Sequence, residues 1–141
     1  MKLSDDVLAA VMDRLFGGQA LPVPSDYDIG LSSTRPNDDG TGITEPTVNG
    51  YARVTVANDL TTFAAADAAA RSKTNAATIT FPTVTDTDSP DGWGPLAYVV
   101  LFDNATDDYS GGGLLGTLLN PQTGDAVEFA PGDFTINGPG S

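Results

Sequence analysis

The stretch Leu96-Ala97-Tyr98-Val99-Val100-Leu101-Phe102 is apolar without interruption. A run of this length and composition is typical of a β-strand that is covered on both faces. We therefore expect it to be the central strand of the fold. With 141 residues, the chain is long enough for one domain that buries roughly 70% of the surface its unfolded form would expose.

Shorter segments with strand character lie on both sides of this run. They are residues 27–31, 51–56, 78–81 and 113–119. The first three alternate between apolar and polar side chains, as half-buried strands do, and the last is weaker. Near the end of the chain we expect a hairpin in which 126–129 pairs with 134–136. Pro131-Gly132 suits the two central positions of the type II turn between them.

One helix precedes all of these strands. Ser4 can cap its start by accepting from an orphan amide, the two aspartates that follow oppose the positive end of the helix dipole, and Gly17-Gly18 ends it. Apolar residues recur at three- and four-residue spacing. The candidate docking residues in this stripe are Leu8, Val11, Met12, Leu15 and Phe16. Only the proline-bearing connector 21–24 ties the helix to the strands, so we expect the stripe to dock onto a partner.

These elements predict a mostly β fold. Two packed sheets, forming a sandwich or jelly-roll-like domain with one N-terminal amphipathic helix, suit many short strands joined by tight turns. We divide the chain into residues 1–24, the helix with its proline-containing connector, and residues 25–141, the β-sandwich domain. The alanine-rich residues 64–71 favour helix by propensity but offer nothing large to bury, so a surface helical turn and an irregular loop both stay open.

The composition excludes several kinds of function. The chain has no cysteine and no histidine, which removes disulfides, thiolate and imidazole metal sites, and Ser-His or Cys-His nucleophiles. Nineteen acidic against six basic residues give a formal net charge of −13, which repels nucleic acid and anionic lipid. No apolar run approaches the roughly 18 residues of a membrane span. The acidic start is unlike a signal peptide, and we expect neither nucleic-acid nor membrane partners.

Three residues in or near the predicted strands are expected to have particular structural roles. Arg53 lies inside an alternating strand, where an arginine usually needs a partner, and Glu45 precedes it on a loop. We favour a structural ion pair between Glu45 and Arg53 over a role in recognition. Trp93 opens the apolar run, and its ring is placed to cap the core. The alternative is an interface anchor, because tryptophan is enriched both in cores and at binding hot spots.

Clusters of aspartate raise the question of a calcium site, since calcium prefers carboxylate oxygens. The two clusters are Asp86, Asp88 and Asp91, and Asp103, Asp107 and Asp108. Neither has the ligand spacing of an EF-hand loop, so we expect solvated turns and no cofactor, with calcium as the alternative. A carboxylate pair for glycoside hydrolysis has no distinguishing mark among nineteen acids, and we expect no enzyme activity.

Several segments follow one another in a recognisable order. They are the N-terminal helix, residues 27–32, residues 44–54 with Glu45 ahead of Gly50-Tyr51-Ala52-Arg53, residues 75–82, residues 93–103 opened by Trp93-Gly94, and a closing glycine-rich hairpin. In this order they resemble a family of small tailed-phage virion proteins, known as tail-fibre or head-decoration proteins. The resemblance covers nearly the whole chain and implies a structural role without catalysis or cofactor. The strong acidity and the acidic turn at 86–91 depart from the family's pattern.

The resemblance implies a tailed-phage virion protein on the head or the tail, and the compactness of the chain leads us to expect an exterior capsid decoration protein. Its partners would be the major capsid protein or other virion proteins, and a homo-oligomer is expected, with a trimer favoured. A compact block without a coiled-coil shaft or a repeat suits a capsid lattice better than a long fibre. On such a particle the acidic surface should face outward, away from the genome.

Two alternatives come from other classes of function. The first is a tail-fibre or tail-tip module of the same kind of virion. The second is a carbohydrate-binding module, which would use exposed aromatic rings. It requires several of these rings to share one solvent-facing platform. The aromatic candidates are Tyr27, Trp93, Tyr98 and Tyr109.

Overall fold

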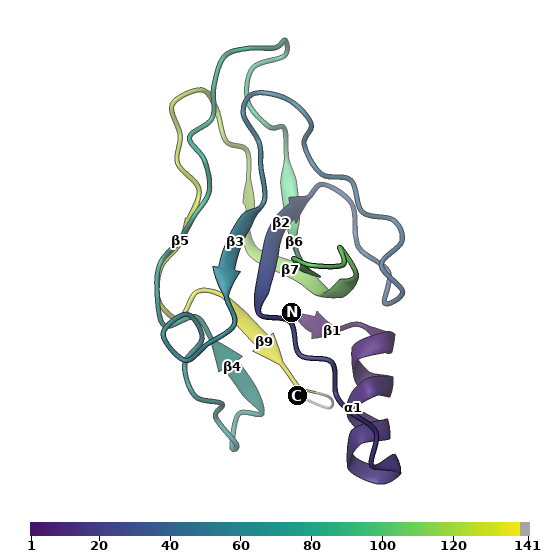
Figure 1. Ribbon diagram of the computed structural model, residues 1–141. Helices are drawn as coiled ribbons and strands as arrows, with labels where there is room; N and C mark the ends of the chain where they lie inside the picture. The colour runs from purple at the N-terminus through teal and green to yellow at the C-terminus, as the bar shows by residue number, and fades with distance from the viewer. Residues whose placement is uncertain (139–141) are drawn as a thin grey trace.

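A computed structural model describes residues 1–138 of the chain (Figure 1). Its helix is α1 (Asp5–Gly17). The strands are β1 (Lys2–Leu3), β2 (Asp26–Ser32), β3 (Val54–Ala57), β4 (Ser72–Thr74), β5 (Ile79–Thr80), β6 (Leu96–Asp103), β7 (Tyr109–Leu119), β8 (Glu128–Phe129) and β9 (Thr135–Asn137). The predicted class, mostly β with one N-terminal helix, is confirmed.

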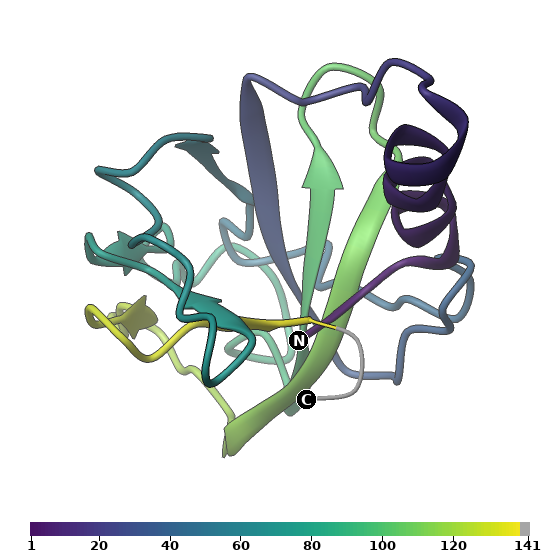
Figure 2. The same cartoon turned by 90° about the horizontal axis from the view of Figure 1, so that it is seen from below.

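The strands form one large sheet and one small sheet. The large sheet has seven strands in the order β3-β2-β6-β7-β1-β9-β4, and β5 pairs with β8 in a sheet of two. Figures 1 and 2 show the large sheet curling, so that β4 and β9 cross the direction of β2 and β6. The curl brings the small sheet over one face of the large one, and the core lies between them.

Strand β6 is the apolar run from which the fold was predicted. It pairs antiparallel with β2, from Tyr27↔Asp103 to Ser32↔Tyr98, and antiparallel with β7 on its other edge. Val99 and Leu101 point into the core, and Val100 and Phe102 on the opposite face are buried as well. An interior strand covered on both faces has the continuous apolar sequence that β6 shows.

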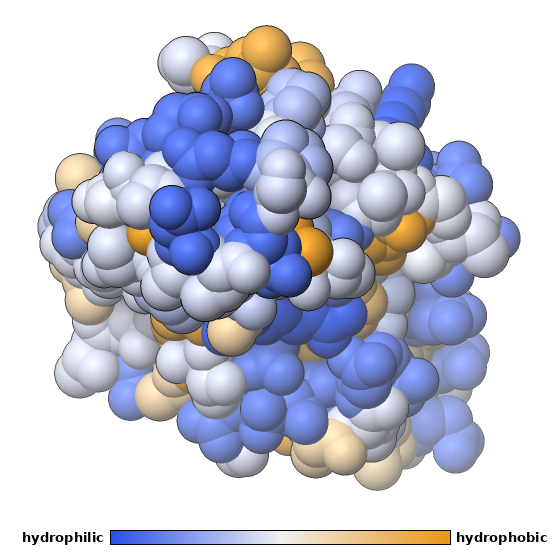
Figure 3. Space-filling view, turned by 90° about the horizontal axis from the view of Figure 1, so that it is seen from above, coloured by the Kyte–Doolittle hydropathy of each residue, from blue (hydrophilic) through white to orange (hydrophobic). Residues whose placement is uncertain are grey.

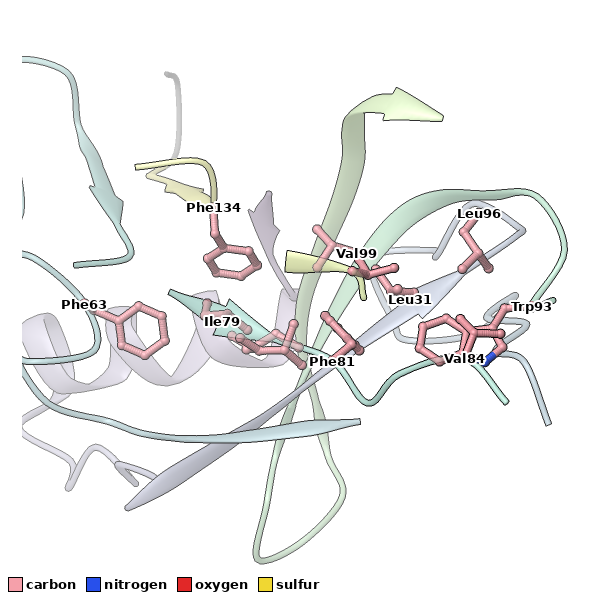
Figure 4. Packing of buried hydrophobic residues seen from close by; sticks show 12 residues of the cluster. Leu31, Phe63, Ile79, Phe81, Val84, Trp93, Leu96, Val99 and Phe134 are labelled. Atoms are coloured by element: carbon pink, nitrogen blue, oxygen red, sulfur yellow. The ribbon is translucent and has the colours of Figure 1, made fainter. Parts of the chain in front are cut away.

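The core is elongated. Figure 4 shows Phe63 and Phe134 at one end and Trp93, Val84 and Leu96 at the other. All of these side chains are buried, and each contributes on the order of 1.5–3 kcal/mol by leaving water. The aromatic members contact one another edge-on or tilted, as their ring quadrupoles favour.

Two buried asparagines hold the long loops that have no strand partner. Asn75 accepts from the amides of Gly132 (3.0 Å) and Phe134 (2.9 Å) and donates to the carbonyl of Ala130 (2.9 Å). Asn49 likewise donates to the carbonyl of Gly92 (2.7 Å). Within residues 1–138, no buried side-chain nitrogen or oxygen lacks a hydrogen-bond partner, which is the condition for burying such groups without penalty.

The predicted hairpin between 126–129 and 134–136 is wrong. Strand β8 pairs instead with β5, and β9 pairs with β4 and β1. The cause is Asn75, whose side chain inserts at the Pro131-Gly132 turn and bonds backbone groups on both sides of it. Those backbone groups cannot then form hydrogen bonds between 126–129 and 134–136, so these two segments join different sheets.

Other expectations need smaller corrections. Of the two alternatives left open for the alanine-rich stretch, the structure shows the loop, which leads into β4 and lacks apolar side chains that a helix could bury. The 113–119 segment, predicted to be weak, belongs to the long strand β7. Strand β1 was not foreseen: it joins the large sheet before the helix begins, although the division at residue 24 stays a prediction. No helix in the described part of the chain is long and apolar enough to cross a membrane.

Candidate functional site

The start of α1 is fixed to the β domain. Ser4 Oγ accepts a hydrogen bond from the Val7 amide (3.3 Å), which caps the helix, while the Ser4 amide donates to the Ser110 carbonyl in β7 (2.9 Å). The Asp5 amide donates to the Asp38 carbonyl (3.1 Å). Ser4 itself is buried. The first turn of the helix is therefore anchored by backbone bonds that leave its side chains free.

The apolar face of α1 is largely uncovered. Leu8 and Val11 are half-buried, but Met12 is 56% exposed, Leu15 67% and Phe16 80%. No residue of the helix is buried. An amphipathic helix normally gains its stability by covering this face, and burying each of the large side chains is worth about 1.5–3 kcal/mol. The predicted docking residues thus form a surface available for contact, which we call the helix face: Leu8, Val11, Met12, Leu15 and Phe16.

The connector after the helix extends this apolar surface along the chain. Leu21 and Val23 are also exposed, at 37% and 68%. Figure 1 shows α1 beside the strands at one end of the molecule. Figure 3 views the molecule from the opposite end, where the surface is mostly hydrophilic and hydrophobic colour is limited to separate small patches. Exposed large apolar side chains that gather on one element are candidates for an interaction site.

The structure brings Glu45 and Arg53 together. Arg53 Nε donates to both carboxylate oxygens of Glu45 (3.1 and 3.0 Å), and Nη2 donates to Oε2 (2.7 Å). The guanidinium also bonds Asp107 and lies 3.6 Å from the centre of the Phe102 ring. Burial alone disfavours the charge of Arg53, but the bonds to Glu45 and Asp107 outweigh it and raise its pKa. The sequence did not indicate that Asp107, 54 residues away, would be a second partner of Arg53.

Tyr51 completes this cluster. Its hydroxyl donates to Glu45 Oε1 (2.6 Å) and accepts from the Leu31 amide (2.8 Å). Burial, together with the Glu45 carboxylate, raises the pKa of Tyr51. A Cβ on Gly30 would lie 2.3 Å from Glu45 Oε1, so only glycine lets β2 pass this close to the carboxylate. The cluster locks the loop that carries Glu45 against β2 and β6.

Trp93 is part of the core. It is 6% exposed, its Nε1 donates to the Asn49 carbonyl (3.0 Å), and its ring packs edge-on against Tyr51 at 5.2 Å between centroids. This is the structural arrangement favoured from the sequence. The interface alternative lacks the exposure it requires, because the ring is covered on all sides by its own chain.

The aspartate clusters do not gather into a metal site. Among residues 1–138, no group of three or more acidic side chains is placed to hold a cation. Asp107 pairs with Arg53 and Asp91 accepts from Thr123, so both are used in holding loops. The calcium alternative therefore has no set of ligands in the described structure.

The four aromatic candidates for sugar binding separate into two groups. Trp93 is in the core, and Tyr27 is half-buried with its ring edge-on to Phe63. Tyr98 and Tyr109 instead line one groove at the surface. The sequence hypothesis required several of these rings on one solvent-facing platform, and two half-buried rings in one groove are what the structure offers.

The described residues form a small β module that presents an apolar helix face at its surface, which is the construction of a protein that assembles with others. The chain belongs to the family described as Podophage GP4 fiber I protein gp80, whose model matches residues 2–137. It is thus a structural protein of a phage virion. Comparison with curated proteins gives no match.

Proposed function

We propose that the chain is a fibre module on the outside of a tailed-phage virion, and that the helix face attaches it to another virion protein. The observation that carries the proposal is the family match over residues 2–137, to a family described as a fibre protein. It favours the tail-fibre alternative over the capsid decoration protein that we expected first. The argument from compactness does not oppose a fibre, because one compact module can be a single part of a longer assembly.

The helix face supports attachment for a physical reason. Leu15 and Phe16 are 67% and 80% exposed on a helix that is already capped and anchored at its first turn. Their exposure has an energetic cost in an isolated molecule, and a partner that covers them recovers this free energy. Hot spots of binding are usually a few large side chains of this kind. Self-association of copies, with a trimer favoured, stays part of the proposal.

The test is incorporation into particles. A phage lacking this gene is complemented with the wild-type chain or with the variant L15S/F16S, and the purified particles are probed for the protein and viewed by cryo-electron microscopy. We expect wild-type density at the tail and at least about tenfold less of the variant, since losing two exposed anchors removes several kcal/mol of binding.

Leu60→Ser is the matched control, because Leu60 is equally exposed at 67% but lies away from the helix. It should incorporate normally. Density on the capsid lattice would restore the decoration hypothesis. Normal incorporation of L15S/F16S would show that the helix face is not the attachment surface.

A further inference from the structure

A groove of about 590 Å³ lies on the large sheet, on the face opposite the core. Its floor is the glycine segment of β7, at Gly112 and Gly113. Tyr98 of β6, Tyr109 of β7 and the loop with Arg35 form its walls. These segments lie far apart in the sequence, and only the pairing of β6, β7 and β1 brings them to one place.

Glycine lets the walls of the groove approach its floor closely. A Cβ on Gly112 would lie 2.6 Å from the Tyr109 hydroxyl and 2.9 Å from Pro36 Cγ, two atoms of the groove walls. Gly112 is buried, and the space that a Cβ would take is filled by these two wall atoms, so glycine lets Tyr109 and Pro36 pack directly against β7. Depressions of this kind, with aromatic walls and a few polar groups, are the usual form of small-ligand sites.

Three polar groups of the groove have no partner among the residues that the structure describes. Neither the Tyr98 nor the Tyr109 hydroxyl makes a hydrogen bond with the residues that the structure describes, and the Arg35 guanidinium makes neither a hydrogen bond nor an ion pair there. Asp38, beside them, is held by Lys2 at 3.0 Å. Of the other arginines, Arg53 is fully engaged by Glu45 and Asp107. Arg35 is thus an exposed donor without a partner among the described residues.

We propose that this groove binds a saccharide. One face of a sugar ring presents C–H groups with slight positive charge, which are attracted to the negative face of an aromatic ring, while its edge carries hydroxyls. Two tyrosine rings whose hydroxyls have no partner among the described residues offer both kinds of contact. Arg35 adds donors for a sugar hydroxyl or a sugar carboxylate, and Asp38 adds an acceptor.

Other ligand classes fit less well. A polyanion such as nucleic acid would approach a chain with a formal net charge of −13. Of the two cationic side chains that line the groove, Lys2 is paired with Asp38 and only Arg35 carries no ion pair in the described structure. A purely apolar ligand would leave Arg35 and the two tyrosine hydroxyls desolvated without partners, which is unfavourable. A saccharide satisfies these groups and covers the rings at the same time.

The experiment uses the full chain on an array of neutral and uronic-acid-containing oligosaccharides, followed by calorimetric titration with the best binder. The two groups on the array distinguish a hydroxyl from a carboxylate as the partner of Arg35. We expect Arg35→Ala to lower the affinity for the saccharide at least about tenfold, since it removes the hydrogen bonds that the charged guanidinium donates. Tyr98→Phe and Tyr109→Phe, which keep the rings, should each lower it several-fold.

Arg14→Ala is the matched control. It removes the same charge from an exposed site on α1, outside the groove, and should leave affinity unchanged. The proposal is overturned if no saccharide binds at millimolar concentration, if Arg35→Ala binds as well as the wild type, or if polyphosphate competes equally. L15S/F16S should keep full saccharide binding, so a failed groove and a failed attachment surface give different results.

Discussion

Arg53 and Glu45 are joined by three hydrogen bonds of 2.7 to 3.1 Å across eight residues of chain. Their side chains are 25% and 17% exposed, so the pair lies between a surface ion pair and a buried one. Bidentate geometry of this kind is the strong form of the arginine–carboxylate interaction. The same guanidinium covers the Phe102 ring, which adds a cation–π contact.

Replacing Arg53 should therefore destabilise the fold. Arg53→Ala leaves Glu45 and the Phe102 ring without their shared partner, and we expect a loss of about 2–3 kcal/mol in the free energy of unfolding. Urea denaturation measures this loss, and a double-mutant cycle with Glu45→Ala should give a coupling above about 1 kcal/mol. Zero coupling would mean that the two side chains act independently. Arg14→Ala, on the exposed helix, should change stability by less than about 0.5 kcal/mol.

Gly30 is the second position where the cluster can be tested. A methyl group there would meet Glu45 Oε1 at 2.3 Å and Val100 Cγ2 at 3.1 Å, so Gly30→Ala should cost more than about 2 kcal/mol. Gly116→Ala is the control, since nothing lies within 4 Å of its Cβ position. That change should be neutral or slightly stabilising by thermal denaturation, because it reduces the entropy of the unfolded chain. Equal effects at both glycines would contradict the close approach of Glu45 to β2.

Tyr109 makes stability depend on alkaline pH. Burial, and then the nearby Asp38 carboxylate, raise the pKa of Tyr109 from 10.0 to about 12. The folded state therefore holds this proton more tightly than the unfolded state. The resulting stability is fully present below pH 10 and is lost between about pH 10 and 12.

Spectrophotometric titration of tyrosinate measures this pKa directly. Asp38→Asn should lower the pKa of Tyr109, and Tyr109→Phe should remove its part of the alkaline loss of stability. Tyr51 and Tyr27, whose pKa values are also raised first by burial, contribute to the loss that remains in Tyr109→Phe. A Tyr109 that titrates near pH 10 in the folded protein would contradict the partial burial that raises its pKa.

Salt should strengthen self-association. A formal net charge of −13 makes copies repel one another, so any association between copies has to rest on apolar contact. Screening removes the repulsion, since the Debye length falls from roughly 30 Å at 0.01 M salt to 3 Å at 1 M. Sedimentation of the purified chain should show larger species as sodium chloride rises. Association that weakens with salt would indicate contacts between opposite charges instead.

The features that sequence alone determined are local or strongly patterned. Helix α1 could be placed because both of its ends depend on local residues. Ser4 Oγ accepts from the Val7 amide at 3.3 Å, and Gly18 ends the helix with a left-handed φ of +64°. Strand β6 could be placed because a strand buried on both faces is apolar at every position. The partnership of Glu45 with Arg53 followed from the need of a strand arginine for a counter-charge within a short loop.

Pairings between distant short strands were decided by the tertiary structure. Strands of two or three residues, such as β1, β8 and β9, carry too little pattern to specify a partner, so the predicted hairpin was lost to Asn75, which lies more than fifty residues before it. Burial of Trp93 and the meeting of Tyr98, Tyr109 and Arg35 depend on the same long-range arrangement. Hydrogen-bond groups of the backbone are alike in every residue, so only the packed chain decides which of them meet.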